Sequence, residues 1–200
     1  MTPIVKKKPA GRYSWQDYIT WPEGERWELI DGVAYAMSPA PSIKHQSIAG
    51  RVYSRLEQSL AGNPCTPLIA PTDVVFSAHD VVQPDVLVVC DPSKLTSENV
   101  QGAPDMVVEV LSPATALRDL REKKALYERH GVKEYLVFDP LALYAQRFCL
   151  GQDGRYGEGD LFGSQEPLLL ETFPGVELRL WEIFGVETPS EQPSRSKELK

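Results

Sequence analysis

The stretch PDVLVV at residues 84–89 and the stretch MVVEVL at residues 106–111 decide the fold of this chain. Both are rich in β-branched residues, which favour buried strands. Asp85 opens the first stretch and Glu109 interrupts the second, so each carboxylate is expected where burial is costly. Two carboxylates that come together repel and raise each other's pKa unless a cation lies between them. A hard divalent ion is therefore expected between Asp85 and Glu109.

A helix is predicted directly after the second stretch. Ser112 is a typical N-cap, Pro113 suits the first turn and Gly131 suits the residue after the end, so the helix is expected over residues 113–130. At about 100° per residue, Lys123 is predicted to face the acid-bearing strands, whereas Lys124 faces solvent. The inward stripe also contains Leu120, Leu126 and Tyr127, with Asp119 and His130 at its edge. A lysine beside a metal-bound phosphate can position the attacking water and help to neutralise the transition state.

A purely structural interpretation of the same residues stays open. Asp119 and Lys123 are four residues apart and could form an intrahelical ion pair. Glu109 could be a buried acid that is bonded to backbone groups. Each residue taken singly favours this structural interpretation, but the order of the surrounding elements favours a site.

The pattern along the chain predicts the element order αβββαβ. A helix is expected over residues 43–61, strands at 73–76 and in the two acid-bearing stretches, the second helix, and a strand at 134–138. The dipeptide Asp31-Gly32 predicts an N-terminal β-hairpin, and strands are expected at the C-terminal end. This order builds an α/β fold, with a mixed β-sheet flanked by helices and a site on the central strands.

Composition predicts one domain with loose ends. A chain of 200 residues that is 42% hydrophobic can bury one sizeable core, and no break in composition marks a second domain. We expect a domain over residues 13–186, a flexible N-terminus over 1–12 and a disordered tail over 187–200, which is rich in Ser, Pro, Glu and Lys.

With these features the chain resembles the PD-(D/E)xK nuclease superfamily, which has the restriction-endonuclease-like fold, and more narrowly the Uma-two family of proposed endonucleases. The resemblance covers about residues 13–180. It depends on ELIDG (28–32), VQPDV (82–86), VEVLSP (108–113) and GVKEY (131–135), together with Asp119, Lys123 and Tyr127. One departure is that Leu111 stands where the superfamily has a lysine, which matches a lysine moved to the next helix as Lys123.

The resemblance implies hydrolysis of a nucleic-acid phosphodiester, in DNA by expectation, with Mg²⁺ or Mn²⁺. Asp85 and Glu109 would bind the metal, the Val110 carbonyl would be a further ligand, and Lys123 would act on the nucleophile or the phosphate. A second ion about 4 Å from the first is compatible with this chemistry.

Auxiliary candidates lie on other elements, and each has a structural alternative. His45 falls on the apolar stripe of the first helix and is expected to face inward, either as a site residue or as a satisfied core histidine. Glu28 matches the acid that many such nucleases add from an N-terminal element, or it is an exposed strand carboxylate. Asp119 and Tyr127 complete the candidates, and Asp73 suits a turn equally well.

Charge argues against tight nucleic-acid binding by this chain alone. The net charge is −7 and the pI is about 5.1, which opposes attraction to phosphates. Basic residues could form a local strip beside the site, namely Lys44, Arg51, Arg55, Arg118 and Arg121. Alternatively a partner or a second subunit supplies the grip, and we expect a homodimer because two-fold symmetry presents one site to each strand. Trp21 and Trp27 suit such an interface or the core equally well.

Compartment and redox state are predicted from what the sequence lacks. No apolar run reaches the length of a signal peptide core or a membrane span, so a cytoplasmic location is expected. Cys65, Cys90 and Cys149 are odd in number and widely spaced, so they are expected to be reduced.

Two other function classes stay open at this point. A binding module that keeps the nuclease fold without turnover is favoured by Leu111, and absence of metal binding would support it. A metal-dependent hydrolase of another phosphoester is favoured by the acidic charge, and a narrow closed pocket would support it.

Overall fold

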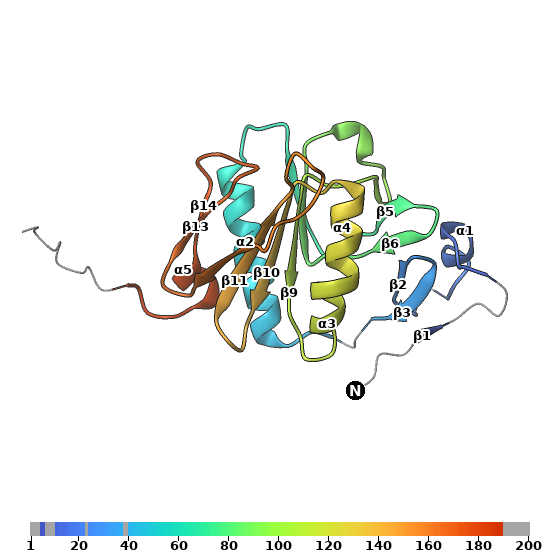
Figure 1. Cartoon of the computed structure of the whole chain (residues 1–200), viewed down its shortest axis with the longest axis horizontal. Helices are drawn as coiled ribbons and strands as arrows, with labels where there is room; N and C mark the ends of the chain where they lie inside the picture. Colours follow the sequence, from blue (N-terminus) through green and yellow to red (C-terminus); the bar gives the residue numbers. More distant parts are fainter. Residues whose placement is uncertain (1–4, 7–10, 23, 38–39, 190–200) are drawn as a thin grey trace, which may run out of the picture.

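The computed structural model describes residues 5–6, 11–22, 24–37 and 40–189. It contains two six-stranded sheets and a separate two-stranded sheet, with the helices packed around the larger ones (Figure 1). The fold is mixed α/β, as the sequence predicts. Most of the expected N-terminal segment 1–12 and tail 187–200 lies outside the described residues.

The central sheet carries both acid-bearing stretches. Its strands, in spatial order, are β12 (Asp160–Gly163), β11 (Tyr144–Cys149), β10 (Glu134–Asp139), β9 (Met106–Val110), β7 (Val86–Val89) and β4 (Thr66–Ile69). Strands β9 and β10 are parallel, and the other neighbours are antiparallel. All residues of β7 and β9 are buried, because helices cover both faces of the sheet.

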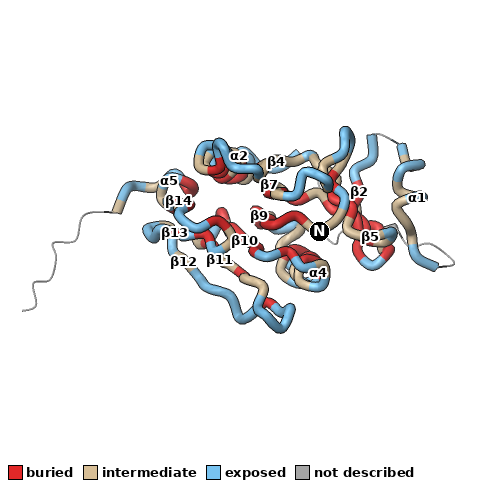
Figure 2. The backbone as a smooth tube through the Cα atoms, turned by 90° about the horizontal axis from the view of Figure 1, so that it is seen from above, coloured by how far each residue is buried: buried red, intermediate tan, exposed pale blue. Residues whose placement is uncertain are grey.

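Helix α2 (Ile43–Ser59) packs on one face of this sheet and α4 (Lys124–His130) on the other (Figure 2). The core is divided accordingly. Val86, Val88 and Val108 belong to the cluster that contains the buried residues of α2, whereas Leu87 and Val107 belong to the cluster with Leu126 of α4. This alternation is the two-residue period of a strand, and it assigns Glu109 to the α4 face.

The helix predicted over 113–130 is interrupted by a π-helical turn. It consists of α3 (Ala116–Arg118), the π turn Asp119–Lys123 and α4, and it ends at Gly131 in the left-handed conformation. Both Asp119 and Lys123 are buried. Single π turns inside helices are frequent at functional sites because they change which side chains face inward.

The second six-stranded sheet is built around the N-terminal hairpin. Its order is β1 (Val5–Lys6), β3 (Val33–Ala36), β2 (Trp27–Ile30), β6 (Asp80–Val82), β5 (Val74–Ser77) and β8 (Val100–Gln101). Asp31 and Gly32 both have positive φ, at 52° and 70°, as the predicted two-residue hairpin turn requires. Helix α1 (Trp15–Tyr18) packs beside this sheet, and Trp21 and Trp27 lie in an aromatic core cluster with Tyr13, Trp15 and Tyr18.

The expected assignment of one strand was wrong. Residues 74–77 were expected in the mixed sheet with the acid-bearing strands, but they belong to the N-terminal sheet, and β4 lies beside β7 in the central sheet. Strand β4 contains Pro67, which cannot donate to a neighbouring strand and therefore weakens the strand signal. Since β4 lies at the edge of its sheet, the proline is tolerated there.

The C-terminal segment packs against α2. It comprises β13 (Pro167–Leu169), β14 (Glu177–Arg179) and α5 (Leu180–Phe184). Arg51 donates to the Ile183 carbonyl over 3.0 Å, and Arg55 donates to the Glu177 carbonyl over 3.0 Å. These two arginines therefore hold the C-terminal segment and do not form the basic strip that was expected.

The cysteine prediction was also wrong. Cys65 and Cys90 form a disulfide, and Cys149 is free. The register pairs Thr66 with Val89, so the two cysteines stand opposite each other one residue further along β4 and β7. A separation of 25 residues in the sequence gives no sign of this pairing.

In the described part of the chain, no helix has the length and apolar character of a membrane span.

Candidate functional site

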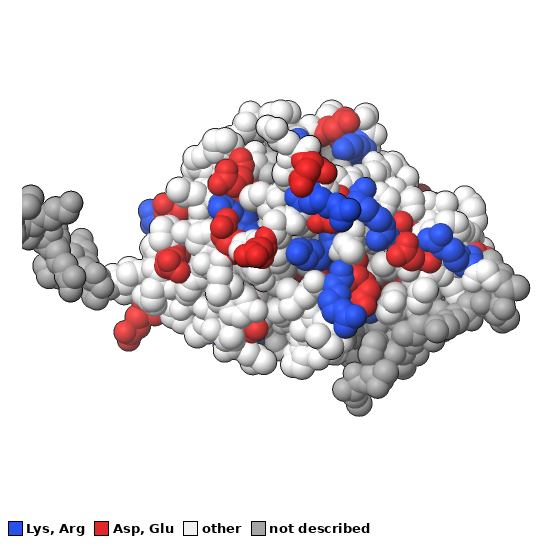
Figure 3. Space-filling view, in the orientation of Figure 1, with Lys and Arg blue, Asp and Glu red and all other residues white. Residues whose placement is uncertain are grey.

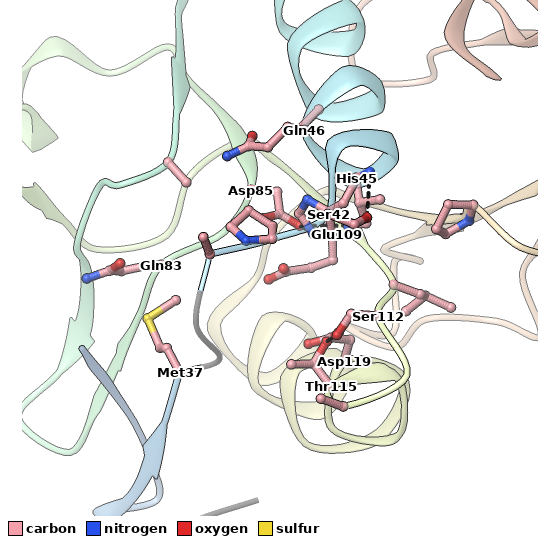
Figure 4. Close-up of a pocket in the computed structure, with 18 of the residues that line it drawn as sticks. Met37, Ser42, His45, Gln46, Gln83, Asp85, Glu109, Ser112, Thr115 and Asp119 are labelled. Atoms are coloured by element: carbon pink, nitrogen blue, oxygen red, sulfur yellow. Dashed lines mark hydrogen bonds and ion pairs between the residues drawn. The ribbon is translucent and has the colours of Figure 1, made fainter. Parts of the chain in front are cut away.

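A cavity of about 560 Å³ opens at the end of the central sheet where β7 begins and β9 ends. The start of α2, the loop from β9 to α3 and the turn after β10 surround it. Asp85, His45 and Glu109 lie together on one side, with Ser112, Thr115 and Asp119 across from them (Figure 4). The lining also includes Lys44, Gln46, Gln83, Val110, Arg118 and Leu141.

The two predicted acids are neighbours across the strand pair. The antiparallel register joins Val86 to Val108, and one further step brings Asp85 opposite Glu109 on the same face of the sheet. One Asp85 oxygen, Oδ2, accepts the Val110 backbone N–H over 2.8 Å. This contact closes the end of the strand pair and turns the Asp85 carboxylate toward the cavity.

Glu109 is almost fully buried and is bonded through one oxygen. Its Oε1 accepts from Lys123 Nζ over 2.8 Å and from the Tyr127 hydroxyl over 2.6 Å. Both donors come from the helix that covers this face, on successive inward positions. Glu109 is thus bonded to side chains, whereas the structural interpretation expected backbone groups.

Lys123 lies at the centre of three carboxylates. Its Nζ is 2.8 Å from Glu28 Oε1, 2.8 Å from Glu109 Oε1 and 3.7 Å from Asp119 Oδ1. The expected intrahelical ion pair with Asp119 is therefore present, but it is the longest of the three contacts. Lys123 does not line the cavity, whereas its partner Glu109 does. Its neighbour Lys124 is half-buried, with Nζ 4.2 Å from the centre of the Phe148 ring.

Burial and charge together shift the pKa values in this cluster. Burial raises the pKa of Glu109 well above its usual range, and the nearby Asp119 and Asp85 add to the rise while Lys123 opposes it. The three surrounding acids hold the pKa of Lys123 above its usual range despite its burial. Lys123 is therefore a permanent cation, and the group that can exchange a proton is one of the carboxyls.

His45 pairs with Asp85 at the other side of the acid pair. Its Nε2 is 3.2 Å from Asp85 Oδ2. Burial lowers the pKa of His45, but the hydrogen bond and charge of Asp85 more than offset this and leave the pKa raised. The inward orientation predicted for His45 is confirmed by its place in the cavity wall.

The donor set at the cavity fits a hard divalent ion such as Mg²⁺ or Mn²⁺. Asp85 Oδ1 and Glu109 Oε2 make no hydrogen bond within the described residues. Neither oxygen is shielded from solvent. Across the described ranges, however, no group of three or more His, Cys, Asp or Glu side chains is arranged around one metal position. Mg²⁺ typically takes one or two carboxylates and completes its shell with water and substrate phosphate, so two carboxylates suffice.

The other candidates divide into two groups. Asp119 and Val110 line the cavity, whereas Glu28 and Tyr127 lie behind it and contact Lys123 or Glu109. Glu28 is fully buried and so is not the exposed carboxylate of the structural alternative. Asp73 does not line the cavity, and it accepts hydrogen bonds from Tyr18 and from Gln83, which does.

Arg118 was expected in a local basic strip beside the site, and it does line the cavity, as does Lys44, whereas Arg121 is exposed and does not. Sequence reasoning missed the burial of Arg118. The helical period does not place Arg118 on the inward stripe. The π turn does not explain its burial either, because that turn begins only at the next residue. On the face in Figure 3, Lys and Arg side chains gather over α3 and α4, with Asp and Glu side chains beside them.

Asp119 is expected to give the protein a measurable pH dependence. Burial raises its pKa to about 6, although Lys123 and a hydrogen bond from Thr115 oppose the rise. The unfolded chain releases this proton near pH 4, so the folded state binds more protons between pH 4 and 6 and loses stability as pH rises through that window. Relative to Asp119→Asn, the free energy of unfolding of the native protein should fall by roughly 2 to 3 kcal/mol across it.

Urea unfolding of both proteins at pH 4, 5, 6 and 7 measures this difference. Glu28, Arg118 and Lys123 also act on Asp119 and are common to both proteins. Asp119 helps to raise the pKa of Glu109, so the difference reports the titration of Asp119 together with its effect on Glu109. A difference that stays constant over the four pH values would contradict the raised pKa of Asp119.

Comparisons with known proteins agree with the fold and the motifs. The Uma2 family model, described as "Putative restriction endonuclease", matches residues 15–180. An uncharacterised protein of Synechocystis sp. is 30% identical over 152 residues, which cover 73% of this chain and 78% of that protein. The crystal structure of a "putative nuclease belonging to DUF820" from Anabaena variabilis has a TM-score of 0.71 at 18% identity, and covers 86% of this chain and 97% of that one.

Proposed function

Because this chain belongs to the Uma2 family, we propose that it is a metal-dependent endonuclease that hydrolyses phosphodiester bonds in nucleic acid, with DNA as its substrate. One observation supports this most strongly. Asp85 and Glu109 stand opposite each other on adjacent strands, and each binds the protein through one oxygen while its other oxygen makes no protein hydrogen bond in the described residues.

In this proposal Asp85, Glu109 and the Val110 carbonyl hold Mg²⁺ or Mn²⁺. Such an ion polarises the phosphoryl oxygen and lowers the pKa of water in its shell. The protein keeps its two acids in place through their remaining contacts. Val110 N–H and His45 hold Asp85, and Lys123 and Tyr127 hold Glu109.

We propose that Lys123 is a positioning residue. It was expected to act on the nucleophile or on the phosphate, but its Nζ is bonded to two carboxylates and Lys123 is absent from the cavity lining. Its charge favours the ionised form of Glu109, which is the form that binds a metal. His45 is proposed to do the same for Asp85 and to stay within reach of the substrate at the cavity wall.

The acidic charge of the chain bears on how it binds its substrate. A net charge of −7 opposes attraction to phosphates, and Arg51 and Arg55 are bonded to the C-terminal segment. We therefore propose that a second copy of the chain contributes to the grip, in a homodimer with one site for each strand.

The expected single domain over 13–186 and the cytoplasmic location also stay predictions.

A cleavage assay tests the proposal. Native protein with Mg²⁺ or Mn²⁺ is expected to nick or cut supercoiled plasmid or labelled single-stranded or duplex oligonucleotides of DNA, and EDTA should stop the reaction. Asp85→Asn should abolish cleavage without changing the circular dichroism spectrum. No cleavage of DNA or RNA by native protein with either metal would contradict the proposal.

A binding module without turnover is the second candidate function. Two observations favour it. The described ranges contain no group of three or more His, Cys, Asp or Glu side chains around one metal position, and Lys123 does not line the cavity. The two candidates differ in the cleavage assay, because a binding module retains the oligonucleotide without cutting it.

A further inference from the structure

Arg118 is a buried cation with unused hydrogen-bonding capacity. Its side chain is only 9% exposed, and it lines the same cavity as Asp85 and Glu109. Nε and Nη1 are shielded from solvent and have no acceptor among the described residues. Nη2 lies 3.7 Å from Glu28 Oε2, which is too long for a hydrogen bond. Three of the five N–H groups therefore belong to nitrogens without a protein acceptor in the described part of the chain.

Charge balance with the acid cluster does not account for this arrangement. An arginine that serves only to neutralise a buried carboxylate usually forms a bidentate pair with short bonds. Here the Glu28 carboxylate instead gives Oε1 to Lys123 over 2.8 Å, while its Oε2 is left without a hydrogen bond among the described residues. Burying unsatisfied N–H groups costs stability, so a group that stays in this state is a candidate for ligand binding.

The guanidinium is also held in place. Its central carbon lies 5.4 Å from the centre of the Tyr35 ring of β3, and Nη2 is close to Glu28 of β2. These contacts come from the N-terminal hairpin, whereas Arg118 belongs to α3. The planar fork is thereby restrained before any ligand arrives, which lowers the entropy cost of binding an anion.

We propose that Arg118 binds a phosphate group of the substrate strand, through its guanidinium group, beside the acid pair. The proposal deepens the endonuclease function above and depends on it for the identity of the ligand. Planar guanidinium groups bind phosphate in a bidentate manner, and a cation at this place offsets the repulsion between the acids and the substrate. Lys123 cannot serve in this way because its Nζ is already bonded to Glu28 and Glu109.

Two variants and one matched control test the role of Arg118. Arg118→Met removes the charge and keeps the bulk, and Arg118→Lys keeps the charge without the fork. Arg121→Met removes an exposed arginine from the same helical segment. Thermal unfolding establishes that each variant is folded, and if Arg118→Met is not, the comparison uses Arg118→Lys.

Inorganic phosphate is the first probe, titrated calorimetrically into metal-free protein. Arg118→Met should weaken its binding about ten- to a hundredfold, Arg118→Lys should weaken it about tenfold, and Arg121→Met should leave it within about twofold. Equal binding by native protein and Arg118→Met, or no binding by native protein, would overturn the proposal. This readout needs no cleavage, so it stands apart from any failure of the nuclease function.

A single-stranded DNA oligonucleotide is the second probe, measured by fluorescence anisotropy without divalent metal. Neutral methylphosphonate linkages are placed at one position at a time. At one position the neutral linkage should weaken binding by native protein about tenfold, and the same linkage should not weaken binding by Arg118→Met any further. The slope of log affinity against log salt concentration should be smaller by about one for Arg118→Met than for native protein. If native protein and Arg118→Met respond alike at every position, Arg118 does not bind the strand.

Discussion

Replacing Glu109 with glutamine is expected to reduce cleavage roughly a thousandfold and to leave the fold intact. The glutamine side chain keeps the shape of the glutamate and an acceptor for Lys123 and Tyr127, which bond to Oε1 in the native protein. It loses the negative charge that a divalent ion needs beside Asp85. Single-turnover cleavage of a labelled oligonucleotide measures the loss, and circular dichroism and thermal unfolding establish that the variant is folded.

Glu134→Gln is the matched control for this variant. Glu134 is also a fully buried glutamate on a central strand, but its oxygens accept the backbone N–H groups of Glu171 and Thr172 over 3.1 and 2.8 Å. It is absent from the cavity lining. We expect Glu134→Gln to lose about 1–3 kcal/mol of stability and to keep its cleavage rate. Cleavage by Glu109→Gln at the native rate would remove Glu109 from the site.

Replacing Lys123 with methionine is expected to produce the largest loss of stability. Lys123 is the nearest cation to three carboxylates, and its removal leaves them buried with the more distant Arg118, 3.7 Å from Glu28, as the remaining cation beside them. The cost should be roughly 3–5 kcal/mol near pH 8. Without Lys123 the pKa values of Glu109 and Asp119 rise further, because this lysine is what opposes their rise. The folded variant then binds more protons than the unfolded chain, so its stability should increase as pH falls toward 5.

Lys124→Met separates this effect from the general cost of losing a lysine. Lys124 is the next residue, it is half-buried, and its Nζ contacts the Phe148 ring instead of a carboxylate. We expect it to cost about 1 kcal/mol or less, with little change between pH 5 and 8. Urea unfolding of both variants at these two pH values gives the comparison. Equal stability of the two variants at pH 8 would contradict the account of Lys123 as the compensating charge.

Local pattern was sufficient to predict the acid pair and the lysine behind it. A carboxylate inside a β-branched run has few explanations, and the two-residue period assigns Glu109 to one face of its strand. In the same way, the helical period predicts that Lys123 faces the sheet and that Lys124 does not. Both inferences depend on residues close in sequence, and the structure places Asp85 and Glu109 on adjacent strands. Their catalytic and metal-binding roles stay predictions.

Features set by long-range pairing could not be predicted in this way. Strand β4 has a proline and a weak pattern, so only its pairing with β7 reveals it, and the same pairing brings Cys65 opposite Cys90. The burial of Arg118 was missed for a related reason. Its burial depends on the N-terminal hairpin, which supplies Tyr35 and Glu28, and the sequence of the helix alone contains no sign of that contact.

Metal binding by the Asp85 and Glu109 pair is the central claim, and a calorimetric titration of Mn²⁺ tests it most directly. The titration compares native protein with Asp85→Asn and with Glu109→Gln at one pH. We predict that native protein binds at least one ion per chain and that each variant binds it at least roughly tenfold more weakly. A native protein that binds no Mn²⁺, or equal binding by all three proteins, would contradict the claim.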